Sequence, residues 1–499
     1  MTLRDTPSPD SSGPTAWQRL DPWMLLVQPL TELRRFLVPL VAVFLFGATQ
    51  GGGSPAAMIA AVGIPVAIGV VRYLTTSYRI ADGRIELQRG LLSRQRLSTP
   101  LDRVRTVDLT ASVVHRMLRL STVGIGTGTA ATDGSDRLEL DALATRNAVA
   151  LRDRLLTGAA ARSDLATTGP AEDGAGDVVP RPVEPLARFK PRWLWYAPFT
   201  STGLVLVGGI LGALGQVAGQ YDLDIRVDED VAAPSGVLIS GVVVVLLLAA
   251  LAITVLGYLV QNGGLTLTRQ PGSWHLRRGL LTTRETSIDV DRVAGVAIGE
   301  QAPLRLARGA RLSAIVTGLD RTDRGSEVLV PPAPAVVART AAAAVLGTRT
   351  PIDSPLASHG PAAIRRQYVR ALLPAALIAV TLGVVLPRVS PWFLLTAPLP
   401  LAAAVALAVD RARSLGHALT DQHLVARSGS LLRRRDILQC DHVIGWTFRD
   451  NWFQRRAGLT TLDATTAGGA GRVTVLDLPV ADATSLADDA LPGLVAQFR

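Results

Sequence analysis

The chain has 499 residues, of which 48% are hydrophobic, with a mean hydropathy of +0.30 and a formal net charge of +10. It is too long for one hydrophobic core, its hydropathy is high for a cytosolic protein, and its positive charge favours anionic partners such as a membrane surface or nucleic acid. The single cysteine, Cys440, excludes an intramolecular disulfide and a multi-cysteine metal site, and its strand-like setting indicates a small core residue.

Residues 1–35 are predicted to form a cytoplasmic N-terminal segment. The first 16 residues are rich in Ser, Pro and Asp and lack the charged start, apolar core and cleavage site of a signal peptide. The stretch Trp17–Leu33 is aromatic, basic and apolar and ends at Arg34 and Arg35. It is typical of a helix lying on the membrane surface, and an ordinary juxtamembrane linker explains it equally well.

Six apolar runs follow in pairs, each near the roughly 20 residues that a helix needs to cross a bilayer. The runs are Phe36–Gly53, Pro55–Leu74, Trp193–Tyr221, Val237–Val260, Tyr368–Leu386 and Trp392–Val409. They predict six transmembrane helices in three hairpins, over residues 36–74, 191–260 and 368–410. In the second hairpin, Gly208 and Gly212 have the spacing at which small residues let two helices approach closely.

After each pair of runs the chain repeats a polar motif, which must be recognised before the fold is assigned. Each copy has a turn-opening glycine, an aspartate twelve residues later and an arginine twenty-six residues later. The glycines are Gly90, Gly279 and Gly429, the aspartates Asp102, Asp291 and Asp441, and the arginines Arg116, Arg305 and Arg455. Each copy alternates apolar and polar residues, as half-buried strands do, and ends in a helix-compatible run: 144–156, 333–346 or 483–498.

The repeats therefore predict three β domains, at residues 75–158, 261–347 and 411–499. Seven or so short strands closed by one helix form a small barrel or an orthogonal sandwich. Residues 159–190 and 348–367 are read as linkers because they are rich in Ala, Gly, Pro and Asp or Ser. The predicted fold class is thus membrane α-helical plus β, with hairpins and β domains alternating.

Arginine sets the predicted orientation. Basic residues flank the spans on the side of the repeats, whereas the opposite loops are neutral, acidic or carry only Arg388. The flanking residues are Arg34, Arg35, Arg72, Arg79, Arg188, Lys190, Arg192, Arg365, Arg366, Arg370, Arg411 and Arg413. By the positive-inside rule, the N-terminus and all three β domains are cytoplasmic.

Paired spans followed by "RGLL" and "LDRV", then by "RMLRL" and "STVGIGTG", resemble the YdbS/YdbT-like bacterial PH-domain membrane proteins. The triple arrangement resembles the YdbT-like branch, over nearly the whole chain outside its linkers. The resemblance implies a pleckstrin-homology-like (PH-like) fold for each repeat, a multi-pass location in a bacterial plasma membrane, and a loose link to the envelope. The sequence departs from the pattern at RQPGSW and LRLARGARLS in repeat two and at His442 in repeat three, which argues against equal ligand binding by the three domains.

Eight arginines near predicted strand ends and turns are candidate contacts for anionic lipid or a partner. Beside a cytoplasmic leaflet each would gain about 1 kcal/mol from anionic lipid, and the alternative is a solvated face that helps to set topology. The candidates are Arg94, Arg96, Arg103, Arg284, Arg292, Arg433, Arg434 and Arg435.

Catalytic, cofactor and metal sites have no candidate in the sequence. The repeated aspartates lack a partner carboxylate or histidine at a constant offset, so helix capping or pairing with the adjacent arginine explains them better. The segment GIGTGTA at Gly124 is not followed by a βαβ unit, and no phosphate loop, nucleophile elbow or H-E-x-x-H motif occurs. We therefore expect no enzymatic activity and no cofactor.

The sequence favours a non-enzymatic integral membrane scaffold that presents three cytoplasmic PH-like domains to protein, peptide or anionic-lipid partners. Expected partners are the bilayer, anionic headgroups and a smaller two-span PH-domain relative, and not nucleic acid. The alternative is a transporter, or an accessory subunit of one, for lipid or drug-like molecules. It is disfavoured because the interiors of the six apolar runs lack the ionisable residues that usually mark ion or proton paths.

Overall fold

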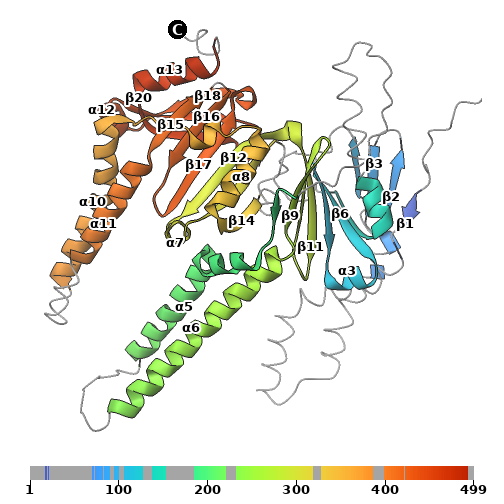
Figure 1. Cartoon of the computed structure of the whole chain (residues 1–499), viewed down its shortest axis with the longest axis horizontal. Helices are drawn as coiled ribbons and strands as arrows, with labels where there is room; N and C mark the ends of the chain where they lie inside the picture. The colour runs from blue at the N-terminus through green and yellow to red at the C-terminus, as the bar shows by residue number, and fades with distance from the viewer. Residues whose placement is uncertain are drawn as a thin grey trace, which may run out of the picture.

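The computed structural model describes residues 17–19, 21, 70–71, 74–81, 84–89, 95–100, 106–126, 138–152, 185–220, 232–317, 328–385, 398–420 and 422–492. These residues form three β modules and two helical hairpins (Figure 1). We call the modules N-terminal (77–152), central (266–346) and C-terminal (416–490). The predicted first hairpin, residues 36–74, lies almost wholly outside the described residues, as do most of the N-terminal segment and residues 159–184 of the first linker.

Within the described residues, each module has six antiparallel strands followed by a helix. The N-terminal module has β2 (Ser77–Ala81), β3 (Arg84–Arg89), β4 (Gln95–Pro100), β5 (Thr106–Ala111), β6 (Leu120–Gly126) and β7 (Leu138–Ala144). The central module has β9 (Thr266–Gln270), β10 (Ser273–Arg278), β11 (Thr283–Asp289), β12 (Val293–Gln301), β13 (Gly309–Val316) and β14 (Val328–Pro334). The C-terminal module has β15 (Gly416–Thr420), β16 (His423–Ser428), β17 (Leu432–Gln439), β18 (Gly445–Arg449), β19 (Leu459–Thr465) and β20 (Arg472–Pro479). The helices that follow are residues 145–152, α8 (Ala335–Leu346) and α13 (Val480–Ala490).

The sheets continue across module boundaries. The last three strands of the N-terminal module join the first three of the central module because β5 pairs with β11, giving the order β7-β6-β5-β11-β10-β9-β8, in which β8 is Ala187–Arg188. In the same way β12 pairs with β17, giving the order β14-β13-β12-β17-β16-β15. Figure 1 shows the central module lying between the other two. The modules are therefore connected by backbone hydrogen bonds and not only by side-chain contact.

Alternating residues supply the cores, as the sequence pattern predicts. Ile85 and Leu87 on β3 are fully buried, whereas Glu86 between them faces outward and pairs with Arg79 at 2.6 Å. By contrast, the first six residues of β12 are all buried, because this strand lies inside a joined sheet with both faces covered. The core of the central module accordingly includes Val425 and Ile437 from the C-terminal module.

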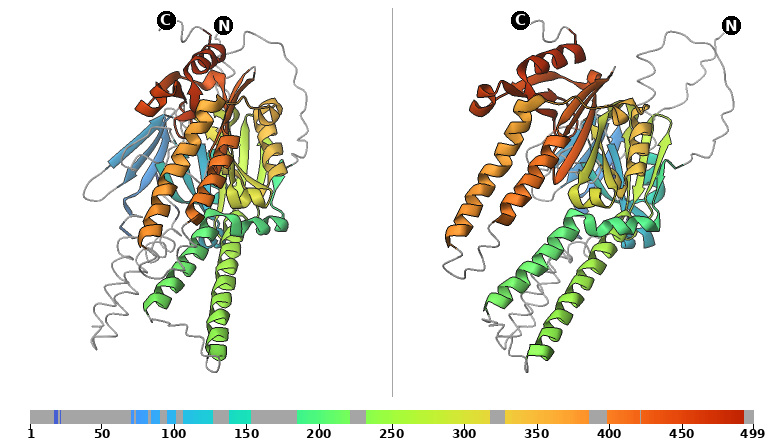
Figure 2. Two further views of the ribbon diagram at one scale, coloured as in Figure 1. Left: turned by 90° about the vertical axis from the view of Figure 1, so that its left-hand side faces the viewer. Right: turned by 60° about the vertical axis from the view of Figure 1, so that its left-hand side comes forward.

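The two described hairpins consist of α5 (Ser201–Gln220) with α6 (Ala232–Asn262), and α10 (Gly360–Val385) with α11 (Pro398–Ser414). Among the described residues, Gly241–Asn262 and Gly360–Val384 are long and apolar enough to cross a membrane. Figure 2 shows both hairpins leaving the β modules on the same side. Their apolar side chains are largely exposed, as expected for helices that face lipid.

The second hairpin starts later than predicted. Residues Pro191–Phe199 form a 3-10 helix, η2, in which Trp193 and Ala197 are buried in the core of the central module. Pro198 lies inside this segment, where it removes a backbone donor and clashes with the carbonyl four residues earlier, so a regular α-helix does not run on from Trp193. The α-helix begins only at Ser201. The side-chain oxygen of Thr200, just before it, accepts a hydrogen bond from the Gly203 N–H at 3.3 Å and so satisfies a donor in the first turn.

Two other local expectations differ from the structure. Gln18–Arg19 form a short strand, β1, paired with β2, so the predicted surface helix does not begin at Trp17. The rest of that stretch lies outside the described residues. A Cβ added to Gly208 or Gly212 would meet no described atom within 4 Å, so within the described residues these glycines mark no close helix approach.

Candidate functional site

A cavity of about 620 Å³ lies where the second hairpin meets the β modules. Its walls come from α5 and α6, from the strands and the short helix α7 (Ala302–Leu306) of the central module, and from β17 of the C-terminal module. We call it the arginine pocket. It lies at the base of the hairpin, where a membrane surface meets the protein if α6 spans the bilayer.

The pocket has an apolar side and a basic side. Leu206 and Ile253 line it from the helices, and Ile253 is largely exposed. Four arginines line it from the strands, and Glu300 is the acidic residue in its wall. The arginines are Arg278, Arg311, Arg433 and Arg434. An amphipathic molecule with a negatively charged head matches both sides.

Hydrogen bonds fix the hairpin against the central module around this pocket. The Tyr258 hydroxyl on α6 donates to the Pro332 carbonyl on β14 at 2.6 Å. The Gln301 side-chain amide at the end of β12 donates to the Ser201 hydroxyl of α5 at 3.0 Å. The helices are therefore held in a defined position over the basic strand ends.

Two of the eight predicted arginines line the pocket, and both also contact carboxylates. Arg433 pairs with Asp410 at the end of α11, with 2.8 Å between Nη2 and Oδ1. Arg434 pairs with Asp436 on its own strand. Asp410 also accepts hydrogen bonds from Arg305 of the central module at 2.9 Å and from Ser430 at 2.9 Å. Asp410 thus connects a hairpin to two β modules, a role that sequence reasoning missed.

Arg435, the next residue on β17, is a structural hydrogen-bond donor. Its Nη2 contacts the Pro351 carbonyl at 2.9 Å and the Ser354 carbonyl at 3.0 Å. Burial lowers the pKa of its guanidinium to about 10, and the positive charge of nearby Arg427 acts in the same direction. Arg435 therefore stays charged at neutral pH and holds the segment between the central module and α10.

Arg284 and Arg292 lie in the central module and also pair within the protein. Arg284 contacts Asp108 of the N-terminal module, with 3.3 Å between Nη2 and Oδ2, across the joined strands β5 and β11. Arg292 contacts Asp289 three residues earlier, at 3.4 Å from Nε to Oδ2. These pairs place both residues away from the arginine pocket.

Of the three remaining predicted arginines, one is described and two are not. The Arg96 guanidinium lies over the Trp17 ring, 5.9 Å from its centroid, beside Arg79 at 4.8 Å. Arg94 and Arg103 lie outside the described residues. Lipid or partner binding by the eight arginines as a set stays a prediction.

The sequence predicts that the repeated aspartates cap a helix or pair with the adjacent arginine; Asp291 and Asp441 do not occupy the capping position, and Asp102 lies outside the described residues. The capping side chain in the central module is Asp289, which accepts a hydrogen bond from the Asp291 N–H at 3.0 Å. The short 3-10 helix that contains Asp441 has no side-chain cap. In both turns the repeated aspartate therefore lies inside the 3-10 helix, two residues after the capping position.

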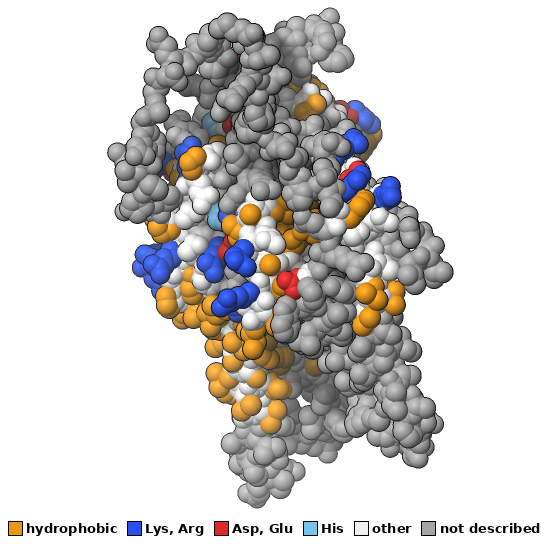
Figure 3. All heavy atoms as spheres, turned by 90° about the vertical axis from the view of Figure 1, so that its right-hand side faces the viewer, with side chains coloured by type: hydrophobic (Ala, Val, Ile, Leu, Met, Phe, Trp, Pro, Cys, Tyr) orange, Lys and Arg blue, Asp and Glu red, His pale blue; other side chains and the backbone are white. Residues whose placement is uncertain are grey.

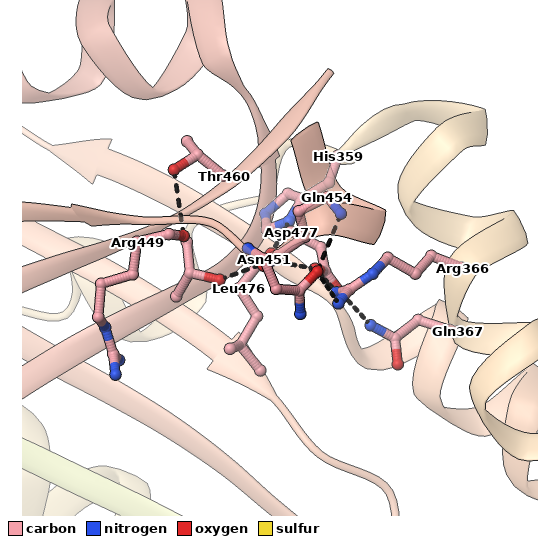
Figure 4. A network of polar contacts seen from close by, with 10 residues as sticks. His359, Arg366, Gln367, Arg449, Asn451, Gln454, Thr460, Leu476 and Asp477 are labelled. Carbon is pink, nitrogen blue, oxygen red and sulfur yellow. Dashed lines mark hydrogen bonds and ion pairs between the residues drawn. The ribbon is translucent and has the colours of Figure 1, made fainter. Parts of the chain in front are cut away.

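A buried polar network attaches the third hairpin to the C-terminal module (Figure 4). Asp477 on β20 is almost fully buried and accepts hydrogen bonds from Arg366 and Gln367 of α10, the latter at 2.7 Å. It also accepts one from the Gln454 amide at 2.8 Å. A buried carboxylate is tolerated because several donors surround it. No repeat motif marked Asp477.

Figure 3 shows Lys and Arg side chains above a stem of apolar side chains on one face of the molecule. This arrangement agrees with the charge pattern expected beside a membrane surface. Among the described residues, no group of three or more His, Cys, Asp or Glu side chains is placed to hold a metal ion.

Comparison with known families gives one finding. Residues 35–159 and 368–491 match the bacterial PH domain family. Each matched region contains a predicted hairpin and the β module after it, so PH-like β-sheet domains are present at both ends of the chain. The central module lies outside the matched residues. Comparisons with curated proteins and with solved structures gave no significant match.

Proposed function

We propose that this chain is a non-enzymatic, multi-pass protein of a bacterial plasma membrane, in which three PH-like domains form a row at the cytoplasmic face. In this proposal the row holds an anionic lipid headgroup in the arginine pocket. The observation that carries the lipid assignment is the pocket itself, because its apolar wall belongs to a helix long enough to cross the bilayer and its opposite wall is basic.

Identical local geometry supports a PH-like assignment for the central module. Twenty-nine residues after each repeat glycine, the backbone is left-handed, at Arg119 (φ 56°), Arg308 (φ 58°) and Gly458 (φ 65°). The N–H of each donates to the carbonyl three residues earlier, at 3.2, 2.9 and 3.1 Å. Arginine is costly in this conformation, so its presence in two modules reflects a turn that the fold demands.

The charges at the helix ends support a cytoplasmic location for the modules. Arg365, Arg366 and Arg370 lie in the first turns of α10, and Arg411 and Arg413 lie in the last turn of α11. Both ends adjoin the C-terminal module (Figure 2). Such an arginine excess is retained on the cytoplasmic side of bacterial membranes.

Binding by the full-length protein tests the lipid assignment. The purified chain is titrated with phosphatidylglycerol, and lipid adducts are counted by native mass spectrometry. Each basic residue near an anionic headgroup contributes about 1 kcal/mol, or roughly fivefold in affinity. The double variant Arg278→Gln/Arg434→Gln is therefore expected to bind phosphatidylglycerol roughly 25-fold more weakly.

The matched control is Arg456→Gln/Arg472→Gln, which removes two exposed arginines of the C-terminal module outside the pocket. It is expected to leave binding unchanged. Equal losses in both double variants, or equal binding of phosphatidylcholine by the unaltered protein, would contradict a headgroup site in the pocket. Reproducible solute flux through vesicles that contain only this chain would favour the transporter alternative.

A further inference from the structure

The two junctions between modules follow one rule. At each, the third strand of the later module pairs with the fourth strand of the earlier one, β11 with β5 and β17 with β12. The register is also the same when residues are counted from the repeat glycines. At the first junction Ile288 faces Thr106, and at the second Leu438 faces Gly295. In each pair the residue of the later module is nine positions after its repeat glycine, and the residue of the earlier module is sixteen positions after its own.

The row ends in two complementary strand edges. Among the described residues, β18 pairs with β19 alone and β4 pairs with β3 alone. β18 is the fourth strand of the last module, and β4 is the third strand of the first. Each therefore offers the edge that its counterparts use at the internal junctions. Open edges are usually covered in native proteins, because their unpaired backbone groups template further pairing.

Side chains around β18 show an unfilled junction. Phe448 on the strand is 42% exposed and Ile444 just before it is 64% exposed. The position sixteen residues after the repeat glycine also indicates an unfilled junction. It is Thr106 in the N-terminal module, Gly295 in the central module and Gly445 in the C-terminal module. A Cβ on Gly295 would lie 2.0 Å from the Ile437 carbonyl oxygen of the partner strand, whereas one on Gly445 would meet nothing within 4 Å.

The arginine twenty-six residues after each repeat glycine behaves in the same way. Arg116 of the N-terminal module donates to the Leu280 carbonyl of the central module at 2.7 Å. Arg305 of the central module contacts Asp410, which the C-terminal residue Arg433 also binds. Arg455 of the last module reaches no further module; it is exposed and pairs with Asp450 at 2.9 Å.

A second copy of this chain is the occupant that fits these edges. One contact between copies would cover the β18 edge of one copy and the β4 edge of the other. Both described hairpins leave the sheets on the same side, so a junction of the same geometry keeps the two copies in one membrane (Figure 2). We propose that β18 of one copy pairs antiparallel with β4 of a second copy, with Gly445 opposite Thr99. The contact joins two different surfaces, so it builds a ring or an open row and not a closed two-fold dimer.

Cysteine crosslinking in membranes that hold the full-length chain tests this register. The same counting places Arg96 opposite Phe448, and both side chains are exposed. Directly opposed Cβ atoms lie about 5 Å apart. Arg96→Cys and Phe448→Cys chains with different tags are co-expressed in a Cys440→Ser background and treated with a short bismaleimide crosslinker. The expected product is a dimer that carries both tags.

The matched control replaces Arg96→Cys with Arg84→Cys, an exposed position on β3, one strand away from the edge. It is expected to yield at least tenfold less mixed dimer. Mixed dimer at equal yield from both pairs, or none from either, overturns the proposal. A double Arg96→Cys/Phe448→Cys chain that crosslinks only within itself also overturns it. The Arg278→Gln/Arg434→Gln variant should crosslink normally, so this proposal and the lipid assignment fail separately.

Discussion

Single buried polar residues determine how firmly this protein holds its helices. His359 lies almost fully buried just before α10, where its Nδ1 hydrogen-bonds the Leu476 carbonyl at 2.7 Å. Its ring centroid is 5.0 Å from that of His417. Burial lowers the pKa of His359 to about 4, with a further lowering from His417. The native protein therefore holds this imidazole in its neutral form at neutral pH.

Acidification is expected to destabilise the C-terminal module through this histidine. The unfolded chain binds a proton near pH 6.5, whereas the folded chain binds it only near pH 4, so the free energy of unfolding falls as pH drops through this range. At pH 5 the loss is roughly 2 kcal/mol. His359→Asn keeps a donor for Leu476 but does not titrate, so its thermal unfolding in detergent should differ less between pH 7.5 and pH 5.

Some dependence on pH should remain in that variant, because burial also lowers the pKa of His115, His417 and His423. An unchanged difference between the two pH values would assign the effect to those residues instead. The sequence alone did not single out His359. Its neighbour His417 lies 58 positions away in the sequence, on another element.

At the scale of elements, the sequence predicts the strands well and their partners poorly. Alternation located β3 because it depends only on which face is buried. The helix-compatible run at 333–346 located α8 within two residues, whereas the run at 483–498 extends eight residues beyond the end of α13. Periodicity contains no information on which edge a strand shares. The pairing of β5 with β11 and of β12 with β17 therefore emerged only from the structure. Hydropathy does not detect the effect of Pro198, which interrupts a regular α-helix and moves the start of the second hairpin to Ser201.

The attachment of α10 to β20 is expected to depend on Asp477. Asp477→Ala leaves Arg366 and the amides of Gln367 and Gln454 without their shared acceptor. Removing one partner of a buried pair costs about 3–5 kcal/mol. The variant should show a much lower unfolding temperature and faster proteolysis at the α10 junction. Asp489→Ala, which removes an exposed carboxylate of α13, is the control; equal effects of the two would contradict the role of Asp477.

At the scale of the whole molecule, the sequence predicts modules after hairpins and the structure adds how the modules connect. Gly279 and Gly429 adopt the positive φ that the predicted turns require, since turn chemistry is local, whereas Gly90 lies outside the described residues. The arginine pocket could not be located in this way, because its walls come from two modules and a hairpin. Of the predicted arginines, Arg433 and Arg434 reach it, and the others pair elsewhere or lie outside the described residues.

Topology gives the most direct test at this scale. A reporter fused after residue 347, at the end of the central module, is expected to be active only as a cytoplasmic reporter. The physical reason is the arginine excess at the module ends of the helices. A matched fusion within residues 221–231, which connect α5 to α6 in the sequence, should give the opposite result. Export of the reporter fused after residue 347 would contradict the cytoplasmic location of the modules.

The joined sheets also bear on how the protein is made. In both junctions the later module completes its first sheet on a strand that belongs to the earlier one. As the ribosome releases the chain, each new module meets a strand that is already paired on one side. For example, β5 pairs with β6, and its other edge stays free until β11 emerges. Synthesis from the N-terminus thus runs in the same direction as assembly. A central module expressed alone would expose the unpaired edges of β11 and β12 and would have a strong tendency to aggregate.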